Sequence, residues 1–186
     1  MDQRDLVRRA QGGDQDAFAE LAGAAVARLD AAARLILRDS ELARDAVQDS
    51  MVRAWRDLPG LRDPDRFVPW LHRLTVNACL DVARRRRRRS IEVELTPIDM
   101  PFVGDATAEF AERELIDDAL RQLEPEFRAV VVLHYFLGMP LHDVAVAMRI
   151  PLGTVKSRLH RALRTMRITL ESADAPAEPV PGGQFA

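Results

Sequence analysis

Apolar residues recur at helical spacing along nearly the whole of this 186-residue chain, and the pattern is interrupted once, between residues 90 and 108. No stretch shows the alternation of a strand, and no internal repeat occurs. The interrupted segment contains Thr96-Pro97, Pro101 and Gly104, a composition that is typical of a linker. The sequence therefore predicts an all-α protein, in which two small helical domains are joined by a flexible acidic linker.

The boundaries of these parts follow from the helical patterns. Residues 1–90 form the first domain, residues 91–111 the linker, residues 112–170 the second domain, and residues 171–186 a Pro- and Gly-rich tail that we expect to be disordered. The helices expected in the first domain are Ala17 to Leu37, Asp39 or Ser40 to Pro59-Gly60, and about Arg66 to the arginine run Arg84–Arg89. Those expected in the second domain are Leu115 to Leu123, Pro125 to Leu137, Leu141 to Met148 and Gly153 to Leu170.

Charge is segregated along the chain, although the net charge is only -2. Residues 1–90 carry 18 arginines against 14 acidic residues, and residues 149–168 carry six basic residues and no acidic one. Between these regions, residues 90–126 carry 11 acidic residues and two basic ones. Two basic regions of this size indicate a polyanionic partner.

Several classes of protein are excluded by the composition. The apolar runs are far shorter than the ~18 residues that a membrane-spanning helix needs, and no signal-peptide pattern follows Met1. The single cysteine, Cys79, excludes a disulfide framework and a multi-thiolate metal site. Neither a Gly-rich phosphate loop nor a nucleophile–base set occurs, and the four histidines lie on different expected helices. We therefore expect a cytoplasmic protein that is not an enzyme and needs no cofactor or metal.

The segment from Leu141 to Leu163 has the pattern of a helix-turn-helix. A short first helix is followed by the turn Arg149–Gly153 and by a second helix with an apolar face. The residues that anchor the second helix to the core are Val155, Leu159, Ala162 and Met166. Its other face presents hydrogen-bond donors and no carboxylate, which is the chemistry that binds phosphates and guanine edges; these residues are Lys156, Ser157, His160, Arg161 and Arg164.

This second helix resembles region 4 of the extracytoplasmic function sigma factors, on the residues Gly153-Thr154-Val155-Lys156-Ser157-Arg158-Leu159 and Arg161-Ala162. The upstream Leu123-Glu124-Pro125 and Arg128 fit the same region. The resemblance implies that the helix reads the minus-thirty-five promoter element. It implies base contacts from Lys156, Ser157, His160 and Arg161, and phosphate contacts from Thr154, Arg158 and Arg164. Arg149 departs from the family, which usually has Gly there; a left-handed backbone would cost Arg about 1 kcal/mol.

The first domain is similar to region 2 of the same family in two segments. Asp45-Ala46-Val47-Gln48-Asp49, continuing to Arg53-Ala54-Trp55, resembles the segment that binds the clamp helices of the largest subunit of RNA polymerase. The resemblance implies that the core polymerase contacts come from Asp45, Gln48, Asp49, Arg53 and Arg56. Trp70-Leu71-His72-Arg73-Leu74, Asn77, Asp81 and the arginine run resemble the part that melts the minus-ten element. The residues implied for that element are Arg62, Arg66, Phe67, Arg73, Leu74, Asn77, Arg84 and Arg85.

The resemblance covers residues 12–90 and 112–168, and it implies three partners: core RNA polymerase, promoter DNA and an anti-sigma factor. Two other classes stay open at the level of the residues. One is a helix-turn-helix repressor or activator that acts without core polymerase, and the other is a helical adaptor that binds a protein. Dependence of promoter binding on core polymerase distinguishes the first class from a sigma factor.

Overall fold

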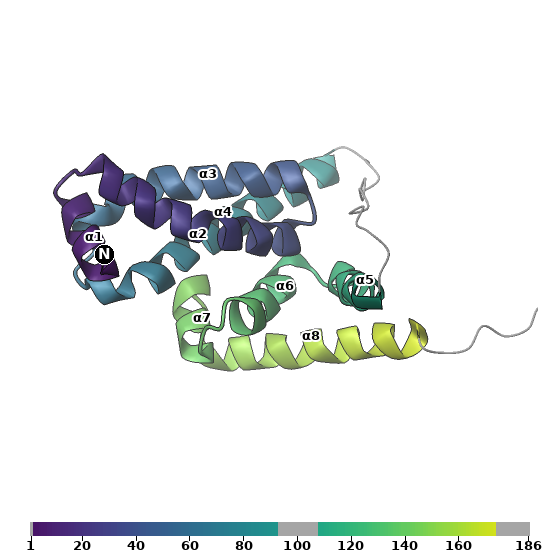
Figure 1. The fold of residues 1–186 in the computed structure, drawn as a ribbon. Helices are drawn as coiled ribbons and strands as arrows, with labels where there is room; N and C mark the ends of the chain where they lie inside the picture. The colour runs from purple at the N-terminus through teal and green to yellow at the C-terminus, as the bar shows by residue number, and fades with distance from the viewer. Residues whose placement is uncertain (1, 93–107, 174–186) are drawn as a thin grey trace, which may run out of the picture.

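The computed structural model describes residues 2–92 and 108–173, and these form eight α-helices and no strand. The first four, shown in purple to teal in Figure 1, are α1 (Gln3–Gln11), α2 (Gln15–Leu37), α3 (Ser40–Asp57) and α4 (Phe67–Glu92). The other four are α5 (Ala108–Arg121), α6 (Pro125–Val131), α7 (Leu141–Met148) and α8 (Leu152–Ala173). The prediction of an all-α fold with two helical domains is confirmed.

Aspartates cap the two helices that follow α1. The carboxylate of Asp14 accepts a hydrogen bond from the backbone N–H of Ala17 at 3.0 Å, which begins α2. The carboxylate of Asp39 accepts from Glu41 at 3.1 Å and Leu42 at 3.0 Å, so that Asp39, of the two residues considered, is the cap of α3. Each such cap stabilises a helix by about 1 kcal/mol because it satisfies a backbone N–H that has no partner within the helix.

The core of the first domain lies between α2, α3 and α4. Its largest fully buried side chains are Leu29, Ile36, Leu58, Phe67, Leu71, Val76 and Leu80. One polar pair is buried among them, because the hydroxyls of Ser50 on α3 and Thr75 on α4 lie 3.0 Å apart. Each hydroxyl also lies within hydrogen-bond distance of a carbonyl of its own helix, Val47 at 2.7 Å for Ser50 and Leu71 at 3.2 Å for Thr75. One hydroxyl can therefore donate to its carbonyl while the other donates across the pair, so the pair is satisfied without water.

Helix α1 was not predicted from the sequence. Only three of its nine residues are buried, namely Leu6, Val7 and Ala10. Three apolar residues within a little more than one helical turn are too few to give a recognisable helical pattern in the sequence. The helix is held by Gln11, whose amide donates to the carbonyls of Leu58 at 3.2 Å and Leu61 at 2.7 Å. It therefore braces the loop that enters α4.

Three helix ends lie beyond the predicted boundaries of the domains. Helix α4 continues through the arginine run to Glu92, and α5 begins at Ala108, so both helices extend into the predicted linker of residues 91–111. Helix α8 ends at Ala173, inside the predicted tail of residues 171–186. The predicted flexibility of the linker and disorder of the tail concern residues that lie outside the described ranges. Within those ranges no helix is both long enough and apolar enough to cross a membrane.

The helix expected from Pro125 to Leu137 is divided in two. After α6, residues Val132–Phe136 form a π-helical turn, in which the N–H of Leu137 donates to the carbonyl of Val132 at 2.9 Å. Gly138 then turns the chain with a φ of 72°, a left-handed conformation that costs glycine little. The wider turn brings the carbonyl of Phe136 to the surface that faces α2.

The two domains pack against each other. Helices α6 and α7 lie between the N-terminal helices and α8 (Figure 1), and the buried apolar residues of both domains form one continuous cluster. Four polar contacts cross the boundary. Arg28 donates to the carbonyl of Phe136 at 2.9 Å, and the amide of Asn77 donates to the carbonyl of Ala147 at 3.2 Å. The other two are the ion pairs Arg38–Asp117 and Arg66–Asp143, the second at 3.6 Å. The domains therefore form a closed pair, an arrangement that the local sequence patterns did not predict.

Candidate nucleic-acid interface

The turn between α7 and α8 has the backbone that the sequence analysis expected for a helix-turn-helix. Arg149 ends α7 with φ 56° and ψ 43°, in the left-handed region. The N–H of Ile150 returns to the carbonyl of Ala145 at 3.1 Å, which closes the end of the helix. Pro151 then accepts hydrogen bonds through its carbonyl from Thr154 at 2.9 Å and Val155 at 3.1 Å, and α8 begins.

Helix α8 separates its apolar and basic residues as predicted. Val155, Leu159 and Ala162 are buried against α6 and α7, and Met166 is half-buried. The five residues expected on the opposite face are all exposed: Lys156, Ser157, His160, Arg161 and Arg164. From Arg149 to Leu170 the chain has no carboxylate, so this face carries only positive or neutral groups. Such a face attracts phosphates.

Two of the residues predicted to contact phosphates are less exposed than the others. Thr154 and Arg158 are both half-buried, and the carbonyl of Thr154 accepts from the hydroxyl of Ser157 at 3.0 Å. The guanidinium of Arg158 lies 6.0 Å from the ring centroid of Phe127 on α6. This cation–π contact stabilises the packing of α8 on α6, and it gives Arg158 a structural role beside any contact with DNA.

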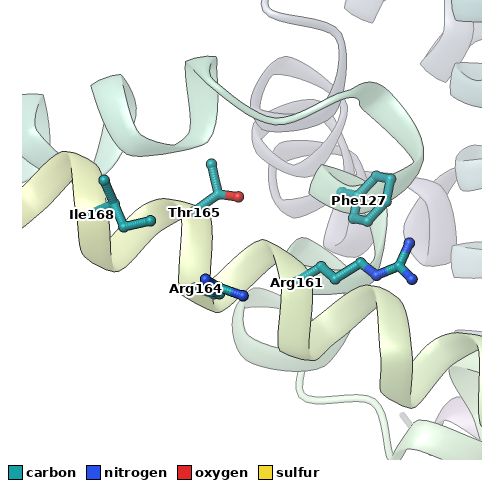
Figure 2. A pocket seen from close by; sticks show the side chains of 5 residues that line it. All are labelled: Phe127, Arg161, Arg164, Thr165 and Ile168. Atoms are coloured by element: carbon teal, nitrogen blue, oxygen red, sulfur yellow. The ribbon is translucent and has the colours of Figure 1, made fainter.

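Arg161 and Arg164 share one shallow pocket on α8. Figure 2 shows the pocket, which they line together with Phe127, Thr165 and Ile168. The two arginines lie three residues apart and therefore occupy one side of the helix. The exposed, basic side of this pocket is where a nucleic acid backbone or base edge would approach.

The residues predicted to bind the downstream element gather where the N-terminal domain meets α7. Arg62, Arg66, Trp70 and Arg73 line a second pocket, between the loop that follows α3 and the first turns of α4. Its other wall is formed by residues of the second domain, which are Met139, Asp143, Val146 and Ala147. Three arginines beside an indole ring are suited to phosphates and to a stacked base.

Two of the residues predicted for this element are placed differently from the expectation. Phe67 is only 2% exposed and lies in the core, so the prediction that it contacts DNA is not supported: its ring has no free face on which a base could stack. The amide of Asn77 is engaged, since it donates to the carbonyls of Arg73 at 2.8 Å and Ala147 at 3.2 Å. Leu74 is half-buried in the core, whereas Arg84 and Arg85 are exposed.

The arginine run begins with internal contacts. Arg84 pairs with Asp81 at 3.1 Å, and the side chain of Arg85 donates to the carbonyl of Asp81 at 3.3 Å. All six side chains from Arg84 to Arg89 are exposed. The end of α4 is thus a strongly positive rod, and its charges lie at the negative end of the helix dipole.

The residues predicted to bind polymerase lie on one side of α3. Asp45, Gln48 and Arg56 are exposed, while Asp49 and Arg53 are half-exposed and paired with each other at 2.6 Å. Arg56 also pairs with its neighbour Asp57 at 2.8 Å. This is a solvent-facing polar surface that the structure leaves uncovered by other described helices.

Two further residues were missed by the sequence analysis. Val52 lies within the polar side of α3 and is 61% exposed, so it is an apolar residue on the surface predicted to bind polymerase. Asp143 of α7 lines the pocket of Arg62, Arg66 and Arg73 from the other domain. Val52 could have been found from the sequence, because it is an apolar residue on the polar side of the expected helix. The position of Asp143 depends on the packing of the domains, which the sequence pattern does not show.

The histidines have separate environments. His72 is buried in the first domain, and burial, with Arg28 nearby, lowers the pKa of its imidazole from 6.5 to about 4. His134 is hydrogen-bonded through Nδ1 to the carbonyl of Met139 at 2.8 Å, and His142 lies 3.1 Å from Asp143. In residues 2–92 and 108–173 no three His, Cys, Asp or Glu side chains gather as metal ligands would.

Comparison with known proteins gives the family. The family model described as Sigma-70 region 2 matches residues 15–89, and the one described as Sigma-70, region 4 matches residues 113–166. The RNA polymerase sigma-E factor of Streptomyces avermitilis is 35% identical over 145 residues, which are 78% of this chain and 80% of that protein. The ECF RNA polymerase sigma factor SigM of Mycobacterium tuberculosis is 38% identical over 151 residues, or 81% and 75%.

Solved structures agree with this assignment. CnrH, solved in complex with the cytosolic domain of CnrY, is similar with a TM-score of 0.66 at 28% identity, over 93% of this chain and 99% of that one. The sigma factor RpoE of Bartonella quintana, solved with the anti-sigma factor NepR, has the same fold, with a TM-score of 0.72 at 23% identity over 83% and 96%. With two sigma regions in order and relatives of this similarity, the chain belongs to the sigma-70 family, as an extracytoplasmic function (ECF) RNA polymerase sigma factor that serves transcription initiation.

Proposed function

We propose that this chain binds core RNA polymerase in the cytoplasm and directs it to promoters, which it reads with both domains. The observation that carries the proposal is the exposed face of α8. A helix-turn-helix presents five donor side chains there, and the 22 residues of α8 include no carboxylate before Glu171. A major groove accepts such a helix, and its phosphates and guanine edges accept hydrogen bonds from these donors.

In this proposal α8 reads the upstream promoter element. Lys156, Ser157, His160 and Arg161 face the bases, and Arg164 binds a phosphate at the edge of the groove. Thr154 and Arg158, which are half-buried, bind phosphates at the rim. Arg158 keeps its contact with Phe127 while it does so, because the cation–π contact uses one face of the guanidinium and leaves its edge free.

The pocket of the N-terminal domain binds the downstream element after melting. Extrusion of a base from the duplex costs a few kcal/mol, which stacking on an aromatic ring and contacts with phosphates can offset. Trp70 is half-buried and lines the pocket, so one part of its indole is available to a base. Arg62, Arg66 and Arg73 surround it, and the exposed Arg84 and Arg85 continue the positive surface along α4.

Helix α3 supplies the contact with polymerase. Its exposed side combines carboxylates, the amide of Gln48 and Arg56 around the exposed Val52. A polar rim around an apolar centre is the usual composition of a protein interface. Asp45, Asp49 and Arg53 would pair with charges of the clamp helices in the largest polymerase subunit.

We also infer a protein partner that holds the chain inactive. CnrH, which is similar over nearly the whole chain, was solved in a complex with the cytosolic domain of CnrY. The closed pair of domains offers one continuous surface to a partner of this kind, and the partner would act as an anti-sigma factor.

The function is tested by transcription in vitro with purified core polymerase of the host bacterium and a promoter library. We expect discrete start sites that depend on this chain, and specific promoter binding only when core enzyme is present. Specific binding of duplex DNA by the chain alone would instead indicate a repressor or activator. A chain that binds neither core enzyme nor DNA would be an adaptor.

A further inference from the structure

The pocket that we assign to melted DNA is partly filled by the chain itself. Of the residues that line it, Asp143 is the only acidic one, and it comes from α7 of the other domain. Its carboxylate Oδ1 lies 3.6 Å from Nη1 of Arg66, and its side chain is 20% exposed while that of Arg66 is 62% exposed. A carboxylate thus lies beside three arginines that would otherwise face a phosphate.

Asp143 is held in place by the packing around it. It stands in the first turn of α7, which begins after Pro140, and a carboxylate there is favoured by the positive end of the helix. Val144 and Ala147 of the same helix are buried, and α4 and α7 make the most extensive contact between the two domains. The backbone of Asp143 therefore stays at this wall of the pocket unless α7 moves away from α4.

The second group at this boundary is the amide of Asn77. It donates to the carbonyl of Ala147, which lies one turn after Asp143 on α7. The carbonyl of Ala147 has no helical N–H to accept from, because the residue four positions on is Pro151. A residue that the family resemblance assigns to the minus-ten element thus donates to a carbonyl of α7, in the same conformation in which Asp143 lines the arginine pocket.

From these contacts we propose that α7 is an intramolecular competitor of single-stranded promoter DNA, with Asp143 in the position of a phosphate. The inference rests on the proposed function, since it takes the arginine pocket as the DNA site. In the closed pair the carboxylate repels an incoming phosphate and Asn77 is occupied. Separation of the domains, which would bind two different promoter elements, frees both groups at once.

The test compares three forms of the full-length chain without polymerase: the parent, Asp143→Asn and Asp118→Asn. Asp118 is the matched control, because it is an exposed aspartate on α5 whose ion pair, with Arg121, stays inside its own domain. The probe is a short, fluorescein-labelled, random-sequence single-stranded DNA. We expect Asp143→Asn to bind it about three- to tenfold more tightly than the parent, and Asp118→Asn to bind like the parent.

The site of the gain is checked in the Asp143→Asn background. Adding Arg62→Ala should remove the gain, whereas adding Arg161→Ala, on α8, should lower the affinity of Asp143→Asn and of the parent by the same factor. The domain separation is measured independently by energy transfer between dyes at Val52→Cys and Ile168→Cys, both of which are exposed positions. Cys79 stays unlabelled, because it is fully buried and burial raises the pKa of its thiol to about 12.

The outcomes separate this inference from the proposed function. If Asp143→Asn lowers the energy transfer and tightens binding through Arg62, α7 competes with DNA as proposed. If it changes neither, or if Asp118→Asn has the same effect, the competition is wrong while the DNA site stands. If the domains separate but no variant binds the probe, the assignment of the arginine pocket to DNA is wrong, and the competition fails with it.

Discussion

The side-chain amide of Asn77 on α4 donates to the carbonyl of Ala147 on α7 at 3.2 Å, and so joins the two domains through a residue that the family resemblance assigns to the minus-ten element. The same nitrogen donates to the carbonyl of Arg73 at 2.8 Å. Asn77 therefore has a structural role in the closed pair, and under the proposed function it would have a second role in an open chain bound to DNA. A variant at this position should affect both states.

We predict that Asn77→Ala lowers the free energy of unfolding by about 1 kcal/mol, because the carbonyl of Ala147 loses its donor. Transcription should fall on duplex promoters and on templates with a pre-melted minus-ten region. Chemical denaturation and in vitro transcription on both templates measure the two effects. Loss of activity on duplex templates alone would show that Asn77 contributes to melting without holding the melted base.

A second prediction concerns pH. The pKa of His72 is about 4 in the folded chain, and its usual value is 6.5. Between pH 6.5 and pH 4, His72 is therefore protonated in the unfolded chain but neutral in the folded chain. Stability should therefore fall as the pH drops from 6.5 to 4, by about 3 kcal/mol at most, and this loss should not grow further below pH 4.

The measurement is urea denaturation of the parent and of His72→Gln at several pH values from 7 to 4.5. The variant should show a flatter dependence, because it has no imidazole to protonate at this buried position. The carboxylates of Asp14, Asp57 and Asp65 have pKa values below the usual 3.8, from hydrogen bonds to Ala17, Arg56 and Arg4 respectively. Their protonation falls below the window of the experiment. An equal slope in parent and variant would contradict the prediction.

The helix-turn-helix was the part of the fold that could be predicted best from the sequence. The expected bounds Leu141 to Met148 are those of α7, and the left-handed backbone expected at Arg149 is present. The bounds of α7 depend on local features, namely apolar spacing and a proline, which act within a few residues, whereas the backbone at Arg149 was implied by the resemblance to a family that usually has Gly there.

The packing of the two domains against each other and the burial of Phe67 could not be predicted from local sequence features. Phe67 and Trp70 are three residues apart on one helix, and periodicity alone does not show which ring is buried and which reaches a pocket. The contact between Asp143 and Arg66 joins residues 77 positions apart and depends on the packing of α7 against α4. Helix α1 was missed because its three buried residues are stabilised by tertiary contacts and not by its own pattern.

A third prediction compares two arginines with the same backbone. Arg149 and Arg38 both have a left-handed φ, of 56° and 59°, and each ends a helix. Arg149→Gly should stabilise the chain by about 0.5–1 kcal/mol, because glycine adopts this conformation without strain. Arg38→Gly should destabilise it, because the side chain of Arg38, which is 11% exposed, pairs with Asp117 across the domain boundary. Thermal unfolding of both variants in one buffer decides; two shifts of the same sign would contradict it.

A fourth prediction concerns α3. The double variant Gln48→Arg/Asp49→Arg should reduce affinity for core polymerase at least tenfold, because it raises the net charge of the proposed contact surface by three. It should cost less than about 1 kcal/mol of stability, since only the exposed Asp49–Arg53 pair is lost. Glu20→Arg, at an exposed position of α2, is the control for added positive charge. If the double variant binds core enzyme as the parent does, the polymerase surface lies elsewhere.

The last prediction separates specificity from affinity on α8. Arg161 and Arg164 line the same pocket beside Phe127 (Figure 2), but we assign them different partners. Arg161→Ala should cost about 1–3 kcal/mol of binding and relax the preference at one base pair, because it removes a bidentate contact with guanine. Arg164→Ala should weaken binding to all sequences about equally and lower the salt slope by roughly one ion.

The measurement uses holoenzyme on single-base variants of one upstream element, at several salt concentrations. Both substitutions remove one positive charge from the same pocket, so a difference between them reflects the contact that each guanidinium makes with DNA. The contact that we assign to Arg161 is a base, and the one that we assign to Arg164 is a phosphate. Equal salt slopes with a base-specific loss for Arg161→Ala alone would leave Arg164 without a phosphate contact. If Arg164→Ala alters the base preferences while Arg161→Ala leaves them unchanged, α8 enters the groove with the opposite side, and the two assignments must be exchanged.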